Sequence, residues 1–171
     1  NYLPDAVSLE PLCGTLPELV VCKSMSKCYA LSGLRVAYAV SQNMATLRRF
    51  IPPWAVSLPG QLAAVAALRN DAYYAQQYEV IHSERRKMQQ ALDDLGFQVF
   101  SGVANYLLTY LPAASGYSST RFIEACREQG LFVRDAQNMG VLLPNNAVRF
   151  AVRSPEENEK MLSIVDAILA L

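Results

Sequence analysis

The segment that says most about the fold of this chain reads Ser24-Met25-Ser26-Lys27-Cys28-Tyr29-Ala30-Leu31-Ser32-Gly33-Leu34-Arg35. A short apolar run typical of a buried strand, residues 19–22, leads into it, and a second strand-like run, residues 35–40, comes after it. One short segment thus holds a lysine, two hydroxyls just before it and an arginine eight residues after it. We therefore expect a strand, a chemically rich polar loop and a second strand across residues 19–41.

The side chains of this loop suit a small molecule that carries both an aldehyde and a phosphate. A lysine amine forms a Schiff base with an aldehyde when burial or nearby cations lower its pKa. Hydroxyls and a guanidinium together bind a phosphate, and Gly33 removes a Cβ where the backbone must approach the bound group. Pyridoxal 5′-phosphate has both groups, and its sites use a lysine Schiff base. For Lys27 taken alone, a solvated loop lysine is the competing interpretation.

The order Ser-x-Ser-Lys followed by Gly-x-Arg resembles the lysine motif of the class I/II aminotransferases, which are pyridoxal-phosphate enzymes of fold type I. The resemblance implies that Lys27 is the Schiff-base lysine. It also implies that Ser24, Ser26 and Arg35 hold the phosphate of the cofactor. Cys28 lies inside the motif, and we expect it to be a small packing residue rather than a nucleophile.

Further blocks resemble the histidinol-phosphate aminotransferase branch of that family, to which threonine-phosphate decarboxylases also belong. These blocks are residues 53–57, 104–108, 130–135 and 148–158. By that resemblance Arg149 grips a substrate carboxylate or phosphate, Arg134 is a second anion contact, and Asn105 lies near the same pocket. Because an unpaired charge in an apolar strand is costly, a salt bridge inside the small domain is the alternative for Arg149.

Periodic patterns predict how the rest of the chain is organised. Apolar residues recur at three- and four-residue steps over residues 71–95, which predicts a long helix with Gly96 at its C-terminal cap. Only Arg85 interrupts this stripe, and its aliphatic stem can lie along the apolar seam. The last helix has a capping box, with Ser154 before its first turn and Glu157 three residues on. Other predicted helices cover residues 43–51, 60–68 and 118–129, and other predicted strands cover residues 97–100, 105–111, 131–134 and 147–153.

The predicted fold class is α/β, the pyridoxal-phosphate-dependent transferase fold type I. Residues 1–70 form the C-terminal part of the large cofactor-binding domain, and residues 71–95 form a linking helix. Residues 96–171 form a small α+β domain with the element order β-β-α-β-β-α.

Composition excludes several other classes of protein. The 171 residues carry 15 basic and 15 acidic side chains, so the electrostatic footprint of a nucleic-acid binder is absent. No apolar run approaches the roughly 20 residues that span a bilayer. One histidine, His82, and four scattered cysteines offer neither a zinc-ligand spacing nor a Ser-His-Asp triad. The free thiols indicate a reducing, cytoplasmic setting.

The resemblance implies an aminotransferase that acts on an amino acid or an amino-alcohol phosphate, in the manner of histidinol-phosphate aminotransferase. Its partners would be a small amino substrate and a keto acid, and it would form a homodimer without a metal. Two alternatives stay open. One is a threonine-phosphate decarboxylase-like enzyme, which Arg153 and Trp54 weakly favour, and the other is a non-catalytic small-domain module.

The resemblance covers about half of the family's usual length. Family members carry a preceding α/β region that supplies an aromatic ring on the pyridine, an asparagine near O3′ and an aspartate on the pyridinium nitrogen. Asn1 and Tyr2 resemble the residues directly after the Asp-x-x-Tyr block of that region. We therefore expect this chain to be the C-terminal half of such an enzyme, and we expect the isolated chain to fold around its small domain without transaminating.

Overall fold

The computed structural model describes residues 8–140 and 143–170, so Asn1 and Tyr2 lie outside the described residues. The chain divides into two compact units, and the boundary falls between Gln77 and Tyr78. This boundary lies inside the long helix α3 (Asp71–Asp94), which the apolar stripe predicts correctly.

The first unit is built around a hairpin of two antiparallel strands, β1 (Val21–Ser24) and β2 (Ala37–Val40), in which Ser24 faces Ala37. The predicted order of strand, loop and strand is confirmed. The prediction that Lys23 and Ser24 belong to the loop is wrong, because both pair with β2 and so extend the first strand. Around the hairpin lie two 3₁₀ helices and two α-helices: Glu10–Gly14, Ser32–Leu34, α1 (Met44–Arg48) and α2 (Leu58–Leu68).

Helix α2 contributes small buried residues to the apolar core of the first unit. The Ser57 hydroxyl caps the helix by accepting a hydrogen bond from the Gly60 N–H at 3.2 Å. The helix buries a face of small residues, and these pack with Met25, Tyr29 and Val36 in one apolar cluster. The buried small residues of α2 are Gly60, Ala64 and Ala67.

The second unit is an antiparallel sheet of four strands in the order β3-β4-β6-β5. The predicted element order is confirmed, as β3, β4, α4, β5, β6 and α5 follow one another along the chain. The strand expected at residues 131–134 instead covers only Arg134 and Asp135, because the pairing with β6 begins at Arg134. The bounds are β3 (Gln98–Val99), β4 (Tyr106–Tyr110), α4 (Ser119–Glu128), β5 (Arg134–Asp135), β6 (Ala147–Ala151) and α5 (Pro155–Leu169).

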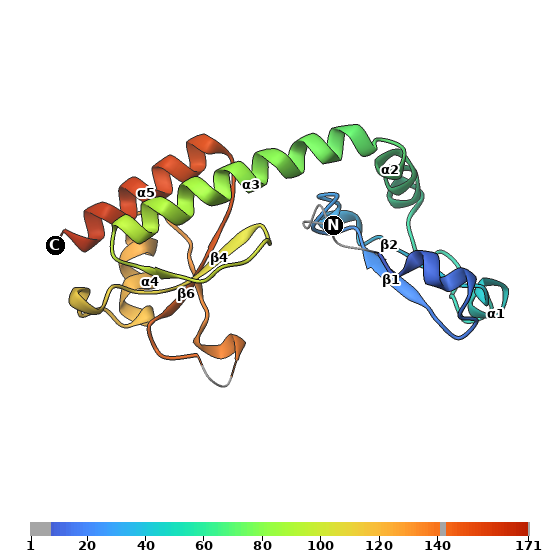
Figure 1. Ribbon diagram of the computed structural model, residues 1–171, viewed down its shortest axis with the longest axis horizontal. Helices are drawn as coiled ribbons and strands as arrows, with labels where there is room; N and C mark the ends of the chain where they lie inside the picture. The colour runs from blue at the N-terminus through green and yellow to red at the C-terminus, as the bar shows by residue number, and fades with distance from the viewer. Residues whose placement is uncertain (1–7, 141–142, 171) are drawn as a thin grey trace. The chain divides into compact units, whose positions relative to one another are not determined.

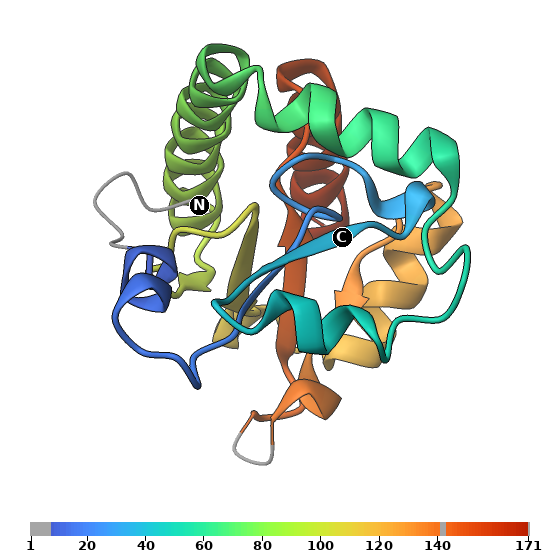
Figure 2. The ribbon, with the colours of Figure 1, turned by 90° about the vertical axis from the view of Figure 1, so that its right-hand side faces the viewer.

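Three helices cover one face of this sheet. Figure 1 and Figure 2 show α5 beside the C-terminal part of α3, and buried residues of α3, α4 and α5 share one apolar cluster with residues of β4 and β6. Alternate residues of the two central strands enter the core, where Leu107 and Phe150 pair directly. Phe122 of α4 is fully buried there and meets the Phe150 ring edge-on, with ring centroids 6.4 Å apart. The other face of the sheet carries Tyr106 and Leu108 of β4 and Arg149 of β6.

The C-terminus of α3 and the N-terminus of α5 carry the caps that the sequence predicts. Gly96 follows α3 with φ of +84°, a left-handed conformation that glycine adopts without a Cβ clash. At the start of α5 the Ser154 hydroxyl accepts from the Glu157 N–H, and the Glu157 side chain accepts from the Ser154 N–H. The capping box predicted from the sequence is confirmed.

A buried polar network joins α3 to the start of α5. Asn158 is only 3 % exposed, and its amide donates to the Glu84 carboxylate at 3.1 Å and to the Arg153 carbonyl at 3.0 Å. Its side-chain oxygen accepts from the Arg153 N–H at 2.9 Å. Glu84 is buried as well and also accepts from the Lys87 amine at 2.7 Å. Every polar group of the Asn158 side chain thus finds a partner, which offsets the loss of its contacts with water.

This network predicts a pH dependence of stability. Hydrogen bonds from Lys87 and Asn158 hold the pKa of Glu84 below its usual value of 4.5. A carboxyl whose pKa is lowered by folding stabilises the fold above its unfolded pKa, and the contribution is lost as the pH falls through the folded pKa. We expect the free energy of unfolding of the natural chain to exceed that of Glu84→Gln at pH 7, and the difference to shrink steadily below about pH 4.5. Urea denaturation at a series of pH values measures it, and a difference independent of pH would contradict the assignment.

Candidate functional site

The loop that carries Lys27 is anchored at both ends by backbone hydrogen bonds. The Met25 N–H donates to the Val36 carbonyl at 3.2 Å, which extends the hairpin by one pair beyond β1 and β2. The Leu31 N–H donates to the Met25 carbonyl at 3.1 Å. Met25 is fully buried and Val36 is 5 % exposed, so apolar side chains hold the base of the loop in place. A loop fixed this way presents its polar residues in a defined arrangement.

The polar side chains of the loop are left at the surface. Lys27 is exposed, and within the described part of the chain its amine has no hydrogen bond or ion pair. Ser24 is exposed too, and its hydroxyl accepts from the Ser26 N–H at 3.3 Å. The Arg35 guanidinium donates to the Ser32 carbonyl at 3.1 Å and is otherwise exposed. The amine, the hydroxyls and most of the guanidinium donors therefore stay available to a ligand.

Two residues of the loop have a backbone conformation that L-amino acids rarely adopt. The φ angles of Ala30 and Arg35 are +55° and +52°. A non-glycine residue in this left-handed region costs about 1 kcal/mol or more. The structure thus accepts strain on both sides of Gly33. A Cβ added at Gly33 would meet no protein atom within 4 Å, so the space beside this glycine is not filled by the chain.

In the second unit, the face of the sheet opposite the helices carries two arginines side by side. Arg134 of β5 and Arg149 of β6 are directly paired residues, and Leu108 of β4 lies opposite Arg149 on the other side. Like charges directly opposite each other on neighbouring strands destabilise a sheet. Among the described residues neither guanidinium has a carboxylate partner. We call this pair the arginine row; its chemistry suits an anion that bridges both groups.

One of these arginines has an aromatic support. The guanidinium carbon of Arg149 lies 4.9 Å from the centroid of the Tyr106 ring, which is cation–π geometry. The two side chains are diagonal neighbours on one face, because Tyr106 pairs with Ala151 and Leu108 pairs with Arg149. Sequence reasoning did not single out Tyr106. The alternation of β4 could have placed it on the polar face, but only the register with β6 brings it to Arg149.

The remaining sequence predictions lie elsewhere in the second unit. Asn105 directly precedes β4, and its backbone carbonyl accepts from the Val152 N–H at 2.9 Å, just after the end of β6. Arg153 forms an exposed ion pair with Glu157 at 3.1 Å. The described residues contain no group of histidine, cysteine and carboxylate side chains that could hold a metal ion, and none of their helices is long and apolar enough to cross a membrane.

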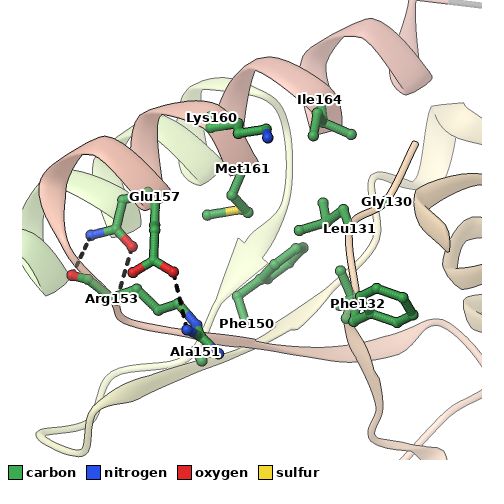
Figure 3. A pocket seen from close by; sticks show the side chains of 12 residues that line it. Gly130, Leu131, Phe132, Phe150, Ala151, Arg153, Glu157, Lys160, Met161 and Ile164 are labelled. Carbon is green, nitrogen blue, oxygen red and sulfur yellow. Dashed lines mark hydrogen bonds and ion pairs between the residues drawn. The ribbon is translucent and has the colours of Figure 1, made fainter.

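A cavity of about 360 Å³ opens between the segment 130–133, β6 and α5. Figure 3 shows its apolar wall, which includes Phe150 and Met161, with the ion pair of Arg153 and Glu157 at one end. None of the residues predicted to bind cofactor or substrate lines this cavity. The arginine row is therefore not part of the lining of this cavity.

Comparison with known proteins gives consistent matches along nearly the whole chain. The family model described as aminotransferase class I and II matches residues 2–165. An aromatic amino acid aminotransferase of Rhodococcus erythropolis is 33% identical over 168 residues, which are 97% of this chain and 44% of that protein. A threonine-phosphate decarboxylase of Salmonella typhimurium is 29% identical over 173 residues, 99% of this chain and 46% of that protein. The crystal structure of the histidinol-phosphate aminotransferase from Clostridium acetobutylicum superposes with a TM-score of 0.82 at 24% identity and covers 95% of this chain and 49% of its own.

The fold is that of the pyridoxal-phosphate-dependent transferases of fold type I, as the elements and the lysine motif predict. More particularly, the chain belongs to the class I and II aminotransferase family. It spans about half the length of the curated relatives that it matches.

Proposed function

We propose that the whole protein is a pyridoxal-phosphate-dependent aminotransferase that acts on an amino acid or an amino-alcohol phosphate. The observation that carries this proposal is the loop that carries Lys27, which we call the lysine loop. It holds an intact Ser-x-Ser-Lys and Gly-x-Arg pattern, is anchored at its base, and presents a Lys27 amine that no other described residue engages. A decaying remnant would not be expected to keep all of these groups together with two strained backbone positions. This argues against the non-catalytic alternative.

The residues of the loop fit the cofactor. The Lys27 amine would hold the aldehyde carbon, and the Ser24 and Ser26 hydroxyls with the Arg35 guanidinium would hold the phosphate. The open space beside Gly33 leaves room for a bound group to approach the backbone. When bound, pyridoxal phosphate supplies a ring that stabilises negative charge at the substrate Cα. The Nζ of Lys27 would take the proton from the substrate Cα as a general base and then donate it to the former aldehyde carbon as a general acid.

The arginine row would hold the acidic group of the substrate. Arg149 is fixed against the Tyr106 ring at 4.9 Å, and Arg134 is its direct neighbour across the strands. Two guanidinium groups can bind a carboxylate or phosphate through parallel hydrogen bonds and so fix the orientation of the bond to be broken at Cα. We keep Asn105, which directly precedes β4, as a third proposed substrate contact.

The proposal extends to the organisation of the protein. We assign residues 1–70 to the large cofactor-binding domain, residues 71–95 to a linking helix and residues 96–171 to the small domain. The separation into two units inside α3 supports this division. A cytoplasmic homodimer that uses a keto acid as amino acceptor would follow from the family resemblance.

A decarboxylase is the second candidate, supported by the match to the Salmonella typhimurium enzyme over 99% of this chain. Arg153 and Trp54 do not distinguish the decarboxylase from the aminotransferase. Arg153 is engaged with Glu157 at the start of α5, a role that either enzyme could use. Trp54 is 96 % exposed, so its surroundings do not favour one reaction over the other.

The experiment that separates the candidates measures two products in the whole protein loaded with pyridoxal phosphate. With amino acids and amino-alcohol phosphates as donors, we expect amino transfer that depends on an added keto acid. Release of carbon dioxide without a keto acid would instead assign the decarboxylase. Neither product from any donor would contradict the proposed function and leave the non-catalytic module.

A further inference from the structure

We propose that Arg85 is a positioning residue: from helix α3 it fixes the segment before β4 and the Tyr106 ring, and through that ring the guanidinium of Arg149. The functional meaning of this inference rests on the proposed role of Arg149 in binding the substrate anion. The structural inference itself concerns only residues of the second unit. It can therefore be tested without cofactor or substrate.

Arg85 is a buried arginine whose guanidinium is only partly hydrogen-bonded. It is only 6 % exposed, and its Nε has no hydrogen-bond partner among the described residues. One terminal nitrogen donates to the Gln89 side-chain oxygen at 3.2 Å, four residues along α3. No carboxylate pairs with the guanidinium in the described chain, and burial lowers the pKa of Arg85. A buried charge without a counter-charge costs free energy, so an apolar side chain would serve better if packing were its only purpose.

The guanidinium of Arg85 lies directly against the segment that leads into β4. A Cβ built at Gly102 would come within 3.2 Å of a terminal nitrogen of Arg85, closer than an ordinary van der Waals contact. The backbone of Gly102 is not left-handed, so turn geometry does not require a glycine here. The guanidinium of Arg85 instead leaves little room for a side chain at this position. The segment then leads to Tyr106, four residues later and at the start of β4.

The second half of the connection is the Tyr106 ring. The guanidinium of Arg149 lies 4.9 Å from its centroid, so the position of the ring determines where that guanidinium is held. The segment before the ring is tied to β6 by the bond from the Val152 N–H to the Asn105 carbonyl at 2.9 Å. Arg134 stands opposite Arg149 and repels it, which would push an unsupported guanidinium away. Arg85 would therefore act on Arg149 indirectly, through the segment that starts at Gly102 and ends at the Tyr106 ring.

The test is the NMR spectrum of the 171-residue chain without ligand. An aromatic ring shifts the resonances of groups above its face upfield, so the Arg149 side chain reports its own contact with Tyr106. In Arg85→Met we expect most of this upfield shift to be lost while the chain stays folded. The matched control is Arg86→Met, which removes an exposed arginine at the next position of the same helix and should keep the shift. An Arg149 shift that is unchanged in folded Arg85→Met overturns the proposal.

A second variant covers the case in which Arg85→Met does not fold. Gly102→Ala keeps Arg85 and displaces its guanidinium by a few tenths of an ångström, because the new Cβ would stand 3.2 Å from a terminal nitrogen. We expect a partial loss of the Arg149 shift, in the same direction. An unchanged shift in this folded variant likewise overturns the proposal.

A titration with inorganic phosphate connects the positioning to binding. We expect Arg85→Met to weaken phosphate binding about tenfold, whereas Arg86→Met leaves it unchanged. A natural chain that binds no phosphate would count against the proposed anion site at Arg149, and the ligand-free shift would still decide the role of Arg85. A phosphate Kd equal in the natural chain and Arg85→Met would show that Arg85 does not act on binding, which overturns the functional half of the inference.

Discussion

Replacing Lys27 with alanine is expected to abolish the visible absorbance of the whole protein loaded with pyridoxal phosphate. It should also lower amino transfer by roughly a thousandfold or more. The reason is chemical: no other amine belongs to the lysine loop, and both covalent attachment of the cofactor and proton movement at Cα need one. Absorbance spectra and initial rates with saturating donor measure the two effects. The fold should be unaffected, because Lys27 is exposed and its side-chain amine makes no hydrogen bond or ion pair within the described part of the chain, while its backbone carbonyl keeps its bond from the Ala30 N–H in the alanine variant.

The matched control for this variant is Lys23→Ala. Lys23 lies in β1, four residues earlier, and its amine is engaged with Glu10 at 3.1 Å and the Ser8 hydroxyl at 2.9 Å. Its loss should cost a small amount of stability and leave the visible band in place. A band that persists in Lys27→Ala, or that disappears equally in Lys23→Ala, would remove Lys27 from the proposed mechanism.

Replacing Asn158 with leucine is expected to destabilise the second unit by about 3 kcal/mol. Leucine has a similar size, so packing changes little, but the buried Glu84 carboxylate loses the amide that donates to it at 3.1 Å. The backbone N–H and carbonyl of Arg153 lose their partners as well. Leaving Oε2 of the buried Glu84 carboxylate and two backbone groups without a partner costs far more than losing an exposed hydrogen bond, although Oε1 keeps its bond from Lys87.

The free energy of unfolding of Asn158→Leu, measured by urea denaturation, tests this expectation. Asn138→Leu is a suitable control, because it makes the same chemical change in the same unit at a position outside the buried network. We expect the control to change stability by less than about 0.5 kcal/mol. A loss below about 1 kcal/mol in Asn158→Leu would mean that the network is not important for stability.

Patterns along the chain predict the elements well and their exact pairing poorly. The long helix, the caps at Gly96 and Ser154 and the β-β-α-β-β-α order follow from periodicity and from side chains that act locally. The start and end of β1 do not, because Lys23 and Ser24 are polar and join the strand only through their partners in β2. Local propensity has little influence where cross-strand pairing decides.

Some residues of the candidate site can be predicted from the sequence, and others become neighbours only in the folded structure. The chemistry of Lys27, Ser24, Ser26 and Arg35 can be read from one short segment, and these assignments stay predictions until cofactor binding is measured. The arginine row cannot be read from spacing, since Arg134 and Arg149 become neighbours only through the register of β5 and β6. The sequence shows Arg85 as an interruption of an apolar stripe, and its burial agrees with that interpretation. Its approach to Gly102 depends on tertiary structure and leaves no mark in the pattern.

The arginine row also has a thermodynamic consequence for handling the protein. The β5–β6 ladder holds the backbones of Arg134 and Arg149 side by side in the folded state, whereas the unfolded chain lets them separate. If anions bridge the two guanidinium groups as we propose, they bind the native state in preference, and mass action makes such anions ligands of folding. The melting temperature of this protein is then a property of the protein together with its buffer, and sulfate or phosphate solutions will report a more stable molecule than chloride at equal ionic strength.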